Sequence, residues 1–517
     1  MRLLSLYVVA MMGGCPAAGL SLGRGSRTGI AGPKDALLQT SSRRRARSST
    51  APLAAAKKAS TPEVVPQGGV TLKSVEGLQE GMKMRQLPNS DLVVTELCLG
   101  TMTFGEQVNK ETAMSLLDAA TGRYGINFID TAESYPSPAG PSTTGRTEQI
   151  VGEWLKGKGK SLRRDSVVIS TKVCGFSDQI TWCRKDQSVG TRVNRQQVFE
   201  AVDAQLKRLG TDYIDLLSIN WPDRYVPMYG ALDYQYELER QATTYRDQLE
   251  IMQELLRSGK IRAFGLSNET PYGVGSFSTT ADLLGLPRPS TTQNCYSLLV
   301  RNEFESGMQE ACSAANGNLG LLAYSPLAGG VLTGKYMDGV KNAPRNSRMR
   351  QYVGFMHRYL SPITNEAVME YAKMADSLSM PLAPIALSFV YSRPFVSSTI
   401  IGATSLQQLE DNVMALNVPM SPEMYRLIQG VYRKFVDPSR GVFDVIDPNL
   451  EYTDPSKLPW GAKDQDVDPE LDALITQRWG AKEKDVDPSP TTPLLTNLSS
   501  SSHPATTTQA QQVLIRV

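Results

Sequence analysis

The feature that most constrains the fold is a series of eight short, apolar, β-rich segments that alternate with helical segments between residues 96 and 402. The segments are Glu96–Gly100, Ile126–Asp130, Val167–Lys172, Tyr213–Asn220, Ile261–Ser267, Thr291–Tyr296, Gly320–Tyr324 and Thr399–Gly402. Strands that alternate with helices form parallel sheets, and eight such units predict a closed (β/α)8 TIM barrel. An open, doubly wound sheet is the alternative. It is disfavoured because Leu99–Gly105 reads LGTMTFG, where such a fold carries G-x-G-x-x-G.

The segments between the strands have the period of amphipathic helices. In Arg195–Leu209, the apolar residues Val198, Val202 and Leu206 fall on one face, and Gly210 is placed to end the helix. Before the first strand, Met82–Thr95 contains a Pro-Asn-Ser-Asp turn signal, which predicts an N-terminal β-hairpin. We therefore expect one barrel domain over residues 83–435.

Residues 1–80 have the composition of a disordered targeting leader. Leu3–Met12 is apolar but too short to span a bilayer, and it suits a signal peptide. An Arg- and Ser-rich stretch follows, including Ser41–Thr50 (SSRRRARSST), and Asp35 is the only acidic residue before Glu63. A signal followed by a transit segment predicts two-step import into a plastid bounded by extra membranes, with a single-step mitochondrial or plastid presequence as the main alternative. A cleaved leader of this kind implies no membrane association of the mature form.

Residues 436–517 form a C-terminal extension with a twofold repeat. Trp460–Pro469 (WGAKDQDVDP) recurs as Trp479–Pro488 (WGAKEKDVDP), and two copies are too few for a solenoid. We interpret the repeat as a duplicated linker, with a docking motif for a protein partner as the alternative. The Ser, Thr and Pro content beyond Pro488 predicts a disordered tail.

Composition excludes several classes of function. The net charge is +2, with no dense basic stripe in the globular part, so a nucleic-acid partner is not indicated. The six cysteines form no C-x-x-C pair, which argues against structural zinc. The chain has two histidines, His357 and His503, so a histidine metal site and a Ser-His-Asp triad are not expected.

Polar groups, three of them titratable, stand at the ends of three successive strands. Asp130 ends the second strand and Tyr135 follows it, Lys172 lies at the tip of the third, and Asn220 ends the fourth. The carboxyl ends of barrel strands meet at one face, where active sites lie. An ammonium beside a phenol lowers its pKa from a usual value of about 10. The pattern predicts that Asp130 holds Lys172 and that Lys172 activates Tyr135 for proton transfer, with a structural Lys–Asp pair as the alternative.

The later strands end in groups suited to a dinucleotide. Ser267, Asn268 and Gln293 are neutral donors and acceptors that match a carboxamide, and Tyr324 offers an aromatic face to a flat ring. Ile400–Thr404 (IIGAT) leads through a glycine into a helix N-terminus, which is a phosphate-binding arrangement. Together these groups point to nicotinamide chemistry.

Residues 83–435 resemble the aldo-keto reductase family, and most of all its bacterial Tas-type branch. The matching stretches are LGTMTFGEQ (Leu99–Gln107), DTAESYP (Asp130–Pro136), STKV (Ser170–Val173), KRLGTDYIDL (Lys207–Leu216), WPDR (Trp221–Arg224), GLSNET (Gly265–Thr270), QNCYSLL (Gln293–Leu299), AYSPLAGGVLTGKY (Ala323–Tyr336) and STIIGATSLQQLEDN (Ser398–Asn412). The resemblance implies NADPH-dependent reduction of a small aldehyde or ketone, with Asp130, Tyr135 and Lys172 in a catalytic tetrad. It implies cofactor contacts from Gly100, Thr101, Met102, Asp130, Ser267, Asn268, Gln293, Tyr324, Ser325, Leu327, Lys335, Arg348, Gly402, Thr404, Gln408, Asp411 and Asn412.

One position departs from the family pattern. The fourth tetrad member of the family is a histidine just before Trp-Pro, and this chain has Asn220 there. An asparagine still donates an N–H toward a carbonyl oxygen, so we expect an enzyme that lost part of one oxyanion contact. The alternative is a regulatory or scaffold module that binds the cofactor with little turnover, because the family includes channel-associated subunits.

Overall fold

The computed structural model describes residues 79, 82–158, 162–231, 233–352 and 354–440. Apart from Gln79, the leader predicted for residues 1–80 lies outside these residues, and so do both copies of the Trp-Gly repeat.

Eight parallel strands close into a barrel, which confirms the predicted fold class. They are β3 (Leu97–Gly100), β4 (Phe128–Asp130), β5 (Val168–Val173), β6 (Ile214–Ile219), β7 (Ile261–Ser267), β8 (Thr291–Cys295), β9 (Gly320–Tyr324) and β10 (Val396–Gly402). Neighbours in the barrel are neighbours in sequence, and β10 pairs with both β9 and β3 to close the ring. Every predicted strand overlaps one of these.

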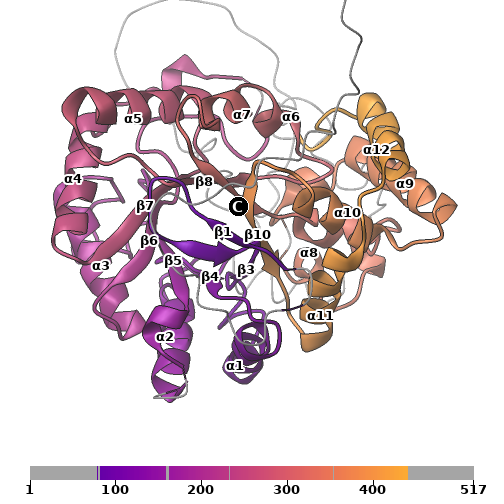
Figure 1. The fold of residues 1–517 in the computed structure, drawn as a ribbon, viewed down its shortest axis with the longest axis horizontal. Helices are drawn as coiled ribbons and strands as arrows, with labels where there is room; N and C mark the ends of the chain where they lie inside the picture. The colour runs from indigo at the N-terminus through magenta and orange to yellow at the C-terminus, as the bar shows by residue number, and fades with distance from the viewer. Residues whose placement is uncertain (1–78, 80–81, 159–161, 232, 353, 441–517) are drawn as a thin grey trace, which may run out of the picture. The chain divides into compact units, whose positions relative to one another are not determined.

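Helices surround the barrel (Figure 1). They are α1 (Lys110–Asp118), α2 (Arg146–Lys158), α3 (Arg195–Leu209), α4 (Tyr245–Arg257), α5 (Pro271–Leu284), α6 (Asn302–Glu305), α7 (Gly307–Cys312), α8 (Arg348–Gln351), α9 (Pro362–Ser377), α10 (Leu382–Tyr391), α11 (Leu406–Met414) and α12 (Pro422–Lys434). The predicted end of α3 is confirmed: Gly210 adopts φ 64°, a left-handed conformation that favours glycine and stops the helix.

The barrel interior is apolar at one end and polar at the other. Side chains two residues apart on a strand point to the same side, so one strand contributes to successive interior layers. The apolar layer consists of Cys98, Phe128, Val168, Leu216, Ala263, Leu322 and Ile400. Asp130 lies two residues beyond Phe128, and Lys172 lies four beyond Val168, so both enter the interior nearer the carboxyl ends of their strands. Strand alternation therefore places these charges in the barrel rather than on its surface.

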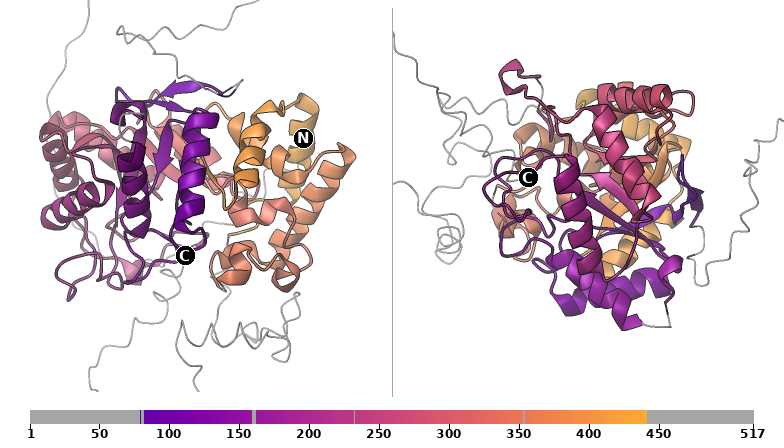
Figure 2. Two further views of the ribbon diagram at one scale, coloured as in Figure 1. Left: turned by 90° about the horizontal axis from the view of Figure 1, so that it is seen from below. Right: turned by 90° about the vertical axis from the view of Figure 1, so that its left-hand side faces the viewer.

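The N-terminal hairpin, β1 (Met84–Gln86) and β2 (Val93–Thr95), covers the apolar end of the barrel. Its residues Leu87, Leu92 and Val94 pack with the apolar interior layer. Figure 1 shows the hairpin over the centre of the ring of strands, and the side views of Figure 2 place it at one end. The opposite end is left for the loops that follow the strands.

Among the described residues, no single helix is long and apolar enough to cross a membrane. Helices α9 and α10 pass that test only as a pair bent by 96°. Their apolar residues, including Val368, Tyr371, Ile385 and Phe389, are buried in the core between barrel and helices.

Candidate active site

A buried ion pair joins the ends of β4 and β5. Lys172 Nζ lies 2.7 Å from Asp130 Oδ2 and donates a second hydrogen bond, also 2.7 Å, to the Thr131 carbonyl oxygen. The other carboxylate oxygen, Asp130 Oδ1, accepts hydrogen bonds from Ser170 Oγ (3.1 Å) and Gln293 Nε2 (2.9 Å). Both side chains are almost fully buried, with 0% of Lys172 and 3% of Asp130 exposed. Burial alone would lower the pKa of Lys172, but Asp130 and Tyr135 raise it, so this lysine stays charged.

Tyr135 lies beside this pair. The Lys172 ammonium is 5.0 Å from the centre of the Tyr135 ring, so the three predicted residues converge. The predicted net fall in the pKa of the phenol is wrong. Burial raises the pKa of Tyr135 above its usual 10.0, and the opposing effect of Lys172 only partly offsets it. Tyr135 is therefore a protonated phenol at neutral pH with a cation placed to stabilise the phenolate that forms when it gives up its proton.

Asn268 connects the ends of β6, β7 and β9. Its Nδ2 donates to the Asn220 carbonyl oxygen (2.8 Å), and its Oδ1 accepts a hydrogen bond from the Tyr324 hydroxyl (2.7 Å). Its φ of 53° is left-handed, a conformation that asparagine tolerates better than most residues. The side chain of Asn220 makes no hydrogen bond to the described residues, although its backbone is held on both sides by Val173 and Asn268.

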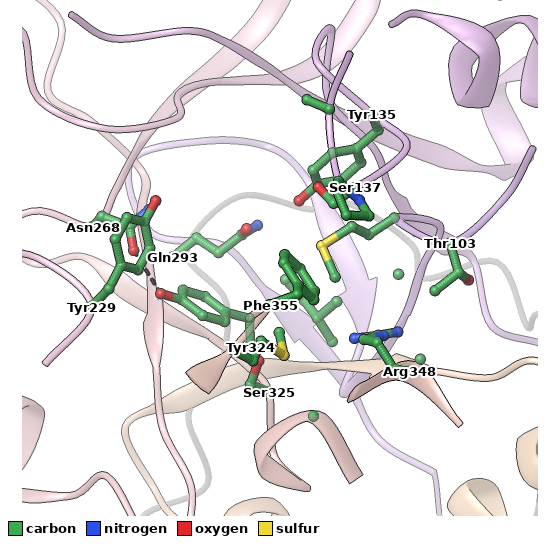
Figure 3. Close-up of a pocket in the computed structure, with 18 of the residues that line it drawn as sticks. Thr103, Tyr135, Ser137, Tyr229, Asn268, Gln293, Tyr324, Ser325, Arg348 and Phe355 are labelled. Atoms are coloured by element: carbon green, nitrogen blue, oxygen red, sulfur yellow. Dashed lines mark hydrogen bonds between the residues drawn. The ribbon is translucent and has the colours of Figure 1, made fainter. Parts of the chain in front are cut away.

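The three residues predicted to bind a carboxamide come together, but they also bind one another. Ser267 Oγ donates to the Gln293 carbonyl oxygen at 2.9 Å, and Gln293 Nε2 donates to Asp130 Oδ1. Figure 3 shows Asn268, Gln293 and Tyr324 grouped on one side of the pocket, with Tyr135 on another. The arrangement links the carboxamide-binding group directly to the Asp130–Lys172 pair.

A cavity of about 610 Å³ opens at the carboxyl ends of the strands. Most of the predicted residues line it: Gly100, Met102, Asp130, Tyr135, Asn220, Ser267, Asn268, Gln293, Tyr324, Ser325, Leu327, Lys335, Arg348, Gly402, Thr404, Gln408, Asp411 and Asn412. Lys172 does not line it, because its side chain is fully buried. Thr101, predicted as a cofactor contact, does not line it either. Its hydroxyl is fully buried and donates to the Asp130 carbonyl oxygen (2.8 Å), so Thr101 supports the strand end that carries the carboxylate.

Two cations mark one part of the cavity wall. Neither Lys335 nor Arg348 has a carboxylate within ion-pair distance among the described residues, and Arg348 makes only a long hydrogen bond to Gln107 Oε1 (3.4 Å). Burial lowers the pKa of Arg348, and burial together with Arg348 lowers that of Lys335. Two such cations, in a cavity that the N-terminus of α11 also lines, suit the phosphates of a dinucleotide. The donor set of the cavity thus fits a nicotinamide cofactor.

Around the start of α11, the residues predicted to surround an adenosine phosphate already form local contacts. Gln408 Oε1 accepts hydrogen bonds from the backbone N–H (2.9 Å) and hydroxyl (3.1 Å) of Thr404. Asn412 Nδ2 donates to the Gly402 carbonyl oxygen at 3.0 Å. These bonds hold the turn between β10 and α11 in place at the cavity wall.

Comparison with known proteins agrees with this geometry. The family model described as "Aldo/keto reductase family" matches residues 96–433, nearly the whole barrel domain. The chain belongs to the aldo/keto reductase family. It is 41% identical over 360 residues to "Protein tas" of Escherichia coli (strain K12), covering 69% of this chain and 100% of that protein. The resemblance inferred from the motifs is confirmed.

Two further relatives of this chain carry different descriptions. An "Aldo-keto reductase" of Babesia bovis is 39% identical over 284 residues, covering 53% of this chain and 98% of the relative. A "Probable voltage-gated potassium channel subunit beta" of Oryza sativa subsp. japonica is 31% identical over 355 residues, covering 68% and 96%. Membership of the aldo/keto reductases makes carbonyl reduction the general class of chemistry for this protein.

Sequence reasoning missed several residues of this aldo/keto reductase pocket, and three of them bear on the arguments below. Tyr229, Phe355 and Arg358 all line the cavity, and they come from the loops after β6 and β9. Loops of this length carry no periodic pattern that would place a side chain, so no signal in the sequence marked them. Among the described residues, no group of three or more His, Cys, Asp or Glu side chains is arranged to hold a metal ion.

Proposed function

We propose that this aldo/keto reductase uses NADPH to reduce an aldehyde or ketone to an alcohol, with Tyr135 as general acid. The observation that carries the proposal is the convergence of Tyr135 on the buried Asp130–Lys172 pair at the wall of a cavity where Lys335 and Arg348 have no counterion among the described residues. When bound, NADPH supplies the hydride that the carbonyl carbon receives.

The protein residues supply and control the proton. Burial keeps the proton on Tyr135 at neutral pH, so its hydroxyl is ready to donate to the carbonyl oxygen as that oxygen gains charge. Lys172, 5.0 Å from the ring centre, stabilises the phenolate that this transfer leaves. Asp130 fixes the position of Lys172, and its other oxygen fixes Gln293.

Asn220 supplies the second contact to the carbonyl oxygen. Its amide lines the cavity without a protein partner in the described residues, so its N–H groups are free to donate. Unlike a histidine, an asparagine adds no positive charge, so the stabilisation it gives is that of a neutral donor. Tyr135 and Lys172 then carry the proton transfer alone.

Residues along the rest of the cavity would hold the cofactor. Ser267, Asn268 and Gln293 would bind the carboxamide, and the ring of Tyr324 would stack on the nicotinamide. Lys335 and Arg348 would bind phosphate oxygens, while Thr404, Gln408, Asp411 and Asn412 would lie around the adenosine 2′-phosphate. Because NADH lacks the 2′-phosphate that these four residues would surround, we expect a preference for NADPH.

The test is a turnover assay with purified protein, NADPH and 4-nitrobenzaldehyde. We expect the reduced nicotinamide absorbance to fall, more slowly with NADH, and the activity to be lost in Tyr135→Phe, which removes the proton donor and keeps the ring. A Tyr135→Phe variant as active as the parent would contradict the proposal.

A second function is favoured by one specific observation. Asn220 replaces the family histidine, and relatives from Oryza sativa and Arabidopsis thaliana carry the name of a probable potassium channel subunit beta. In this alternative the protein is a regulatory module that binds NADPH without significant turnover. Tight NADPH binding combined with no reduction across a panel of aldehydes would support the module over the enzyme.

A further inference from the structure

Arg358 is a buried cation in the wall of the candidate active site. It lies in a 3₁₀ turn, His357–Tyr359, in the long segment between β9 and α9. Only 4% of its surface is exposed, yet it lines the same cavity as Tyr135 and Asn220. Arginine is almost never buried to this extent without a partner, so the partners of Arg358 decide what it does.

The guanidinium has few partners among the described residues. Its one hydrogen bond runs from Nη2 to the Tyr359 hydroxyl oxygen at 2.8 Å, and its Nε is buried with no acceptor. No carboxylate of the described residues lies within ion-pair distance of it. Glu303 is near enough to raise the pKa of Arg358, but Glu303 forms its ion pair with Arg440, at 3.7 Å.

The other groups around Arg358 are neutral. Burial raises the pKa of Tyr229 to about 12, and it raises the pKa of the Tyr324 and Tyr359 hydroxyls and of the Cys295 thiol. All four keep their protons at neutral pH and cannot balance a positive charge. A buried charge with several unused donors is costly unless a ligand pairs with it.

The location of Arg358 separates it from the cations assigned to phosphates. Arg348 lowers the pKa of Lys335, whereas the charge of Arg358 interacts with Tyr359, Cys295, Tyr324 and Glu303 and with neither of those cations. Arg358 is therefore a positive group of the cavity separate from the Lys335–Arg348 pair.

Tyr229 connects Arg358 to the reacting end of the cavity. Its ring centre lies 5.8 Å from the Arg358 guanidinium carbon, and it is also within electrostatic range of Tyr135. Figure 3 shows Tyr229 beside Asn268 and Tyr324. A small molecule in contact with Tyr229 can thus reach both the proton donor and the cation.

We propose that Arg358 binds an anionic group of the substrate, so that the enzyme acts on carbonyl compounds bearing a carboxylate. This inference rests on the proposed reductase function and adds the substrate class to it. The carbonyl oxygen meets Tyr135, and the carboxylate meets the unused N–H groups of Arg358, whose planar fork matches a carboxylate in two parallel hydrogen bonds.

The test compares 4-carboxybenzaldehyde with its methyl ester, methyl 4-formylbenzoate, at saturating NADPH. The two share the aldehyde and the ring and differ in charge. The parent enzyme should have a lower KM for the acid. In Arg358→Gln, KM for the acid should rise by about 10- to 100-fold, the effect of losing charge-assisted hydrogen bonds, while KM for the ester stays within about twofold. Arg358→Lys should recover part of the preference, because it restores the charge without the fork.

Arg240→Gln is the matched control. Arg240 lines the same cavity but stacks on Phe176, 3.6 Å from the ring centre, so its loss removes an equal charge at another place. The preference for the acid should change by no more than about twofold in this variant. An equal loss of preference in Arg240→Gln and Arg358→Gln would show that the overall field of the cavity selects the acid, and it would overturn the role of Arg358.

A second measurement separates this inference from the proposed function. Calorimetric titration with terephthalate, which cannot be reduced, should show binding to the parent protein loaded with NADP⁺ and weaker binding to Arg358→Gln and, less so, to Arg358→Lys. If neither aldehyde is reduced, the reductase proposal fails and this titration still decides whether Arg358 is an anion site. If both aldehydes are reduced equally well, or if Arg358→Gln raises KM for NADPH instead, the reductase stands and the substrate class is wrong.

Discussion

Replacing Lys172 by methionine tests the buried ion pair on which the site depends. Methionine keeps most of the volume of the side chain but removes the ammonium. The Asp130 carboxylate, with 3% of its surface exposed, then keeps only the hydrogen bonds from Ser170 and Gln293. Breaking a buried ion pair by removing one partner destabilises a protein by about 3–5 kcal/mol, because the other charge is left uncompensated. We expect Lys172→Met to lower the free energy of unfolding by about that amount.

A double-mutant cycle also requires the variants that remove the other charge, Asp130→Asn alone and Asp130→Asn combined with Lys172→Met. Asp130→Asn alone leaves the Lys172 ammonium with neutral acceptors only, the Thr131 carbonyl among them, so it should be destabilising to a similar degree. The double variant buries no charge, and replacing both members of a buried pair by neutral groups is often close to neutral. The double variant should therefore be more stable than the sum of the single effects predicts, by roughly 2–3 kcal/mol or more.

Urea unfolding at pH 7 of the parent, the two single variants and the double variant measures the coupling free energy between Asp130 and Lys172. The raised pKa of Lys172 means that its contribution is complete below about pH 10.5, its ordinary value, and is lost only as pH rises beyond the folded value. Arg246 and Glu250 on α4 provide the control cycle, because they form an exposed pair at 2.8 Å with 65% and 48% of the side chains accessible. That pair should couple by only about 0.3–0.5 kcal/mol. Additive effects within about 0.5 kcal/mol at Asp130 and Lys172 would refute the interpretation of the pair as a single coupled unit.

Three further predictions follow from other parts of the structure. Asn220→His should raise the rate of aldehyde reduction by about tenfold or more, toward the 10²–10³-fold that one oxyanion donor supplies; an unchanged rate in steady-state kinetics would mean that asparagine suits another reaction. Because the raised pKa of Tyr135 keeps its proton in place, reduction of a neutral aldehyde should hold its rate up to about pH 10 and fall above it, and a decline centred between pH 7 and 9 would contradict this direction. Gly152→Ala on α2 places a methyl group against the Arg208 carbonyl oxygen of α3, closer than van der Waals contact, and should lower the unfolding free energy by about 1–3 kcal/mol, whereas Gly275→Ala on α5, with nothing within 4 Å, should be neutral or stabilising.

The strands and the charged core of the site could be predicted because they follow from local patterns. A strand that reads apolar, apolar, carboxylate at its end, as Phe128–Asp130 does, fixes which side chain enters the barrel, and the next strand repeats the arrangement up to Lys172. Once eight such units are recognised, closure of the barrel brings Gln293 within 2.9 Å of Asp130 although they are far apart in sequence. Periodicity and topology together determine these contacts.

Properties that depend on burial by many elements at once, such as the pKa of a side chain or its access to the cavity, could not be predicted from the sequence. The pKa of Tyr135 is set by a balance in which desolvation outweighs Lys172, and nearest neighbours in sequence say nothing about the size of that burial. Thr101 looks like a pocket residue from its place after β3, but its hydroxyl turns back to the Asp130 carbonyl. Arg358 reaches the cavity from a loop without periodic pattern, so only the assembled structure reveals its position.

The contacts of residue 220 explain how the histidine of the family pattern can be absent without disturbing the site. The backbone N–H of Asn220 donates to the Val173 carbonyl oxygen, and its carbonyl oxygen accepts from Asn268, so the position is held by atoms common to every amino acid. Its side chain, in contrast, has no hydrogen-bond partner in the described residues. It lines the cavity, so its amide can bond to a ligand there. Asn268, fixed through Asn220, also holds the Tyr324 hydroxyl, so the orientation of the ring proposed to stack on the nicotinamide does not depend on the identity of residue 220. Substitution there can alter the stabilisation of the carbonyl oxygen while leaving the cofactor contacts and the Asp130–Lys172–Tyr135 group in place, and this separation is what makes Asn220→His an informative test.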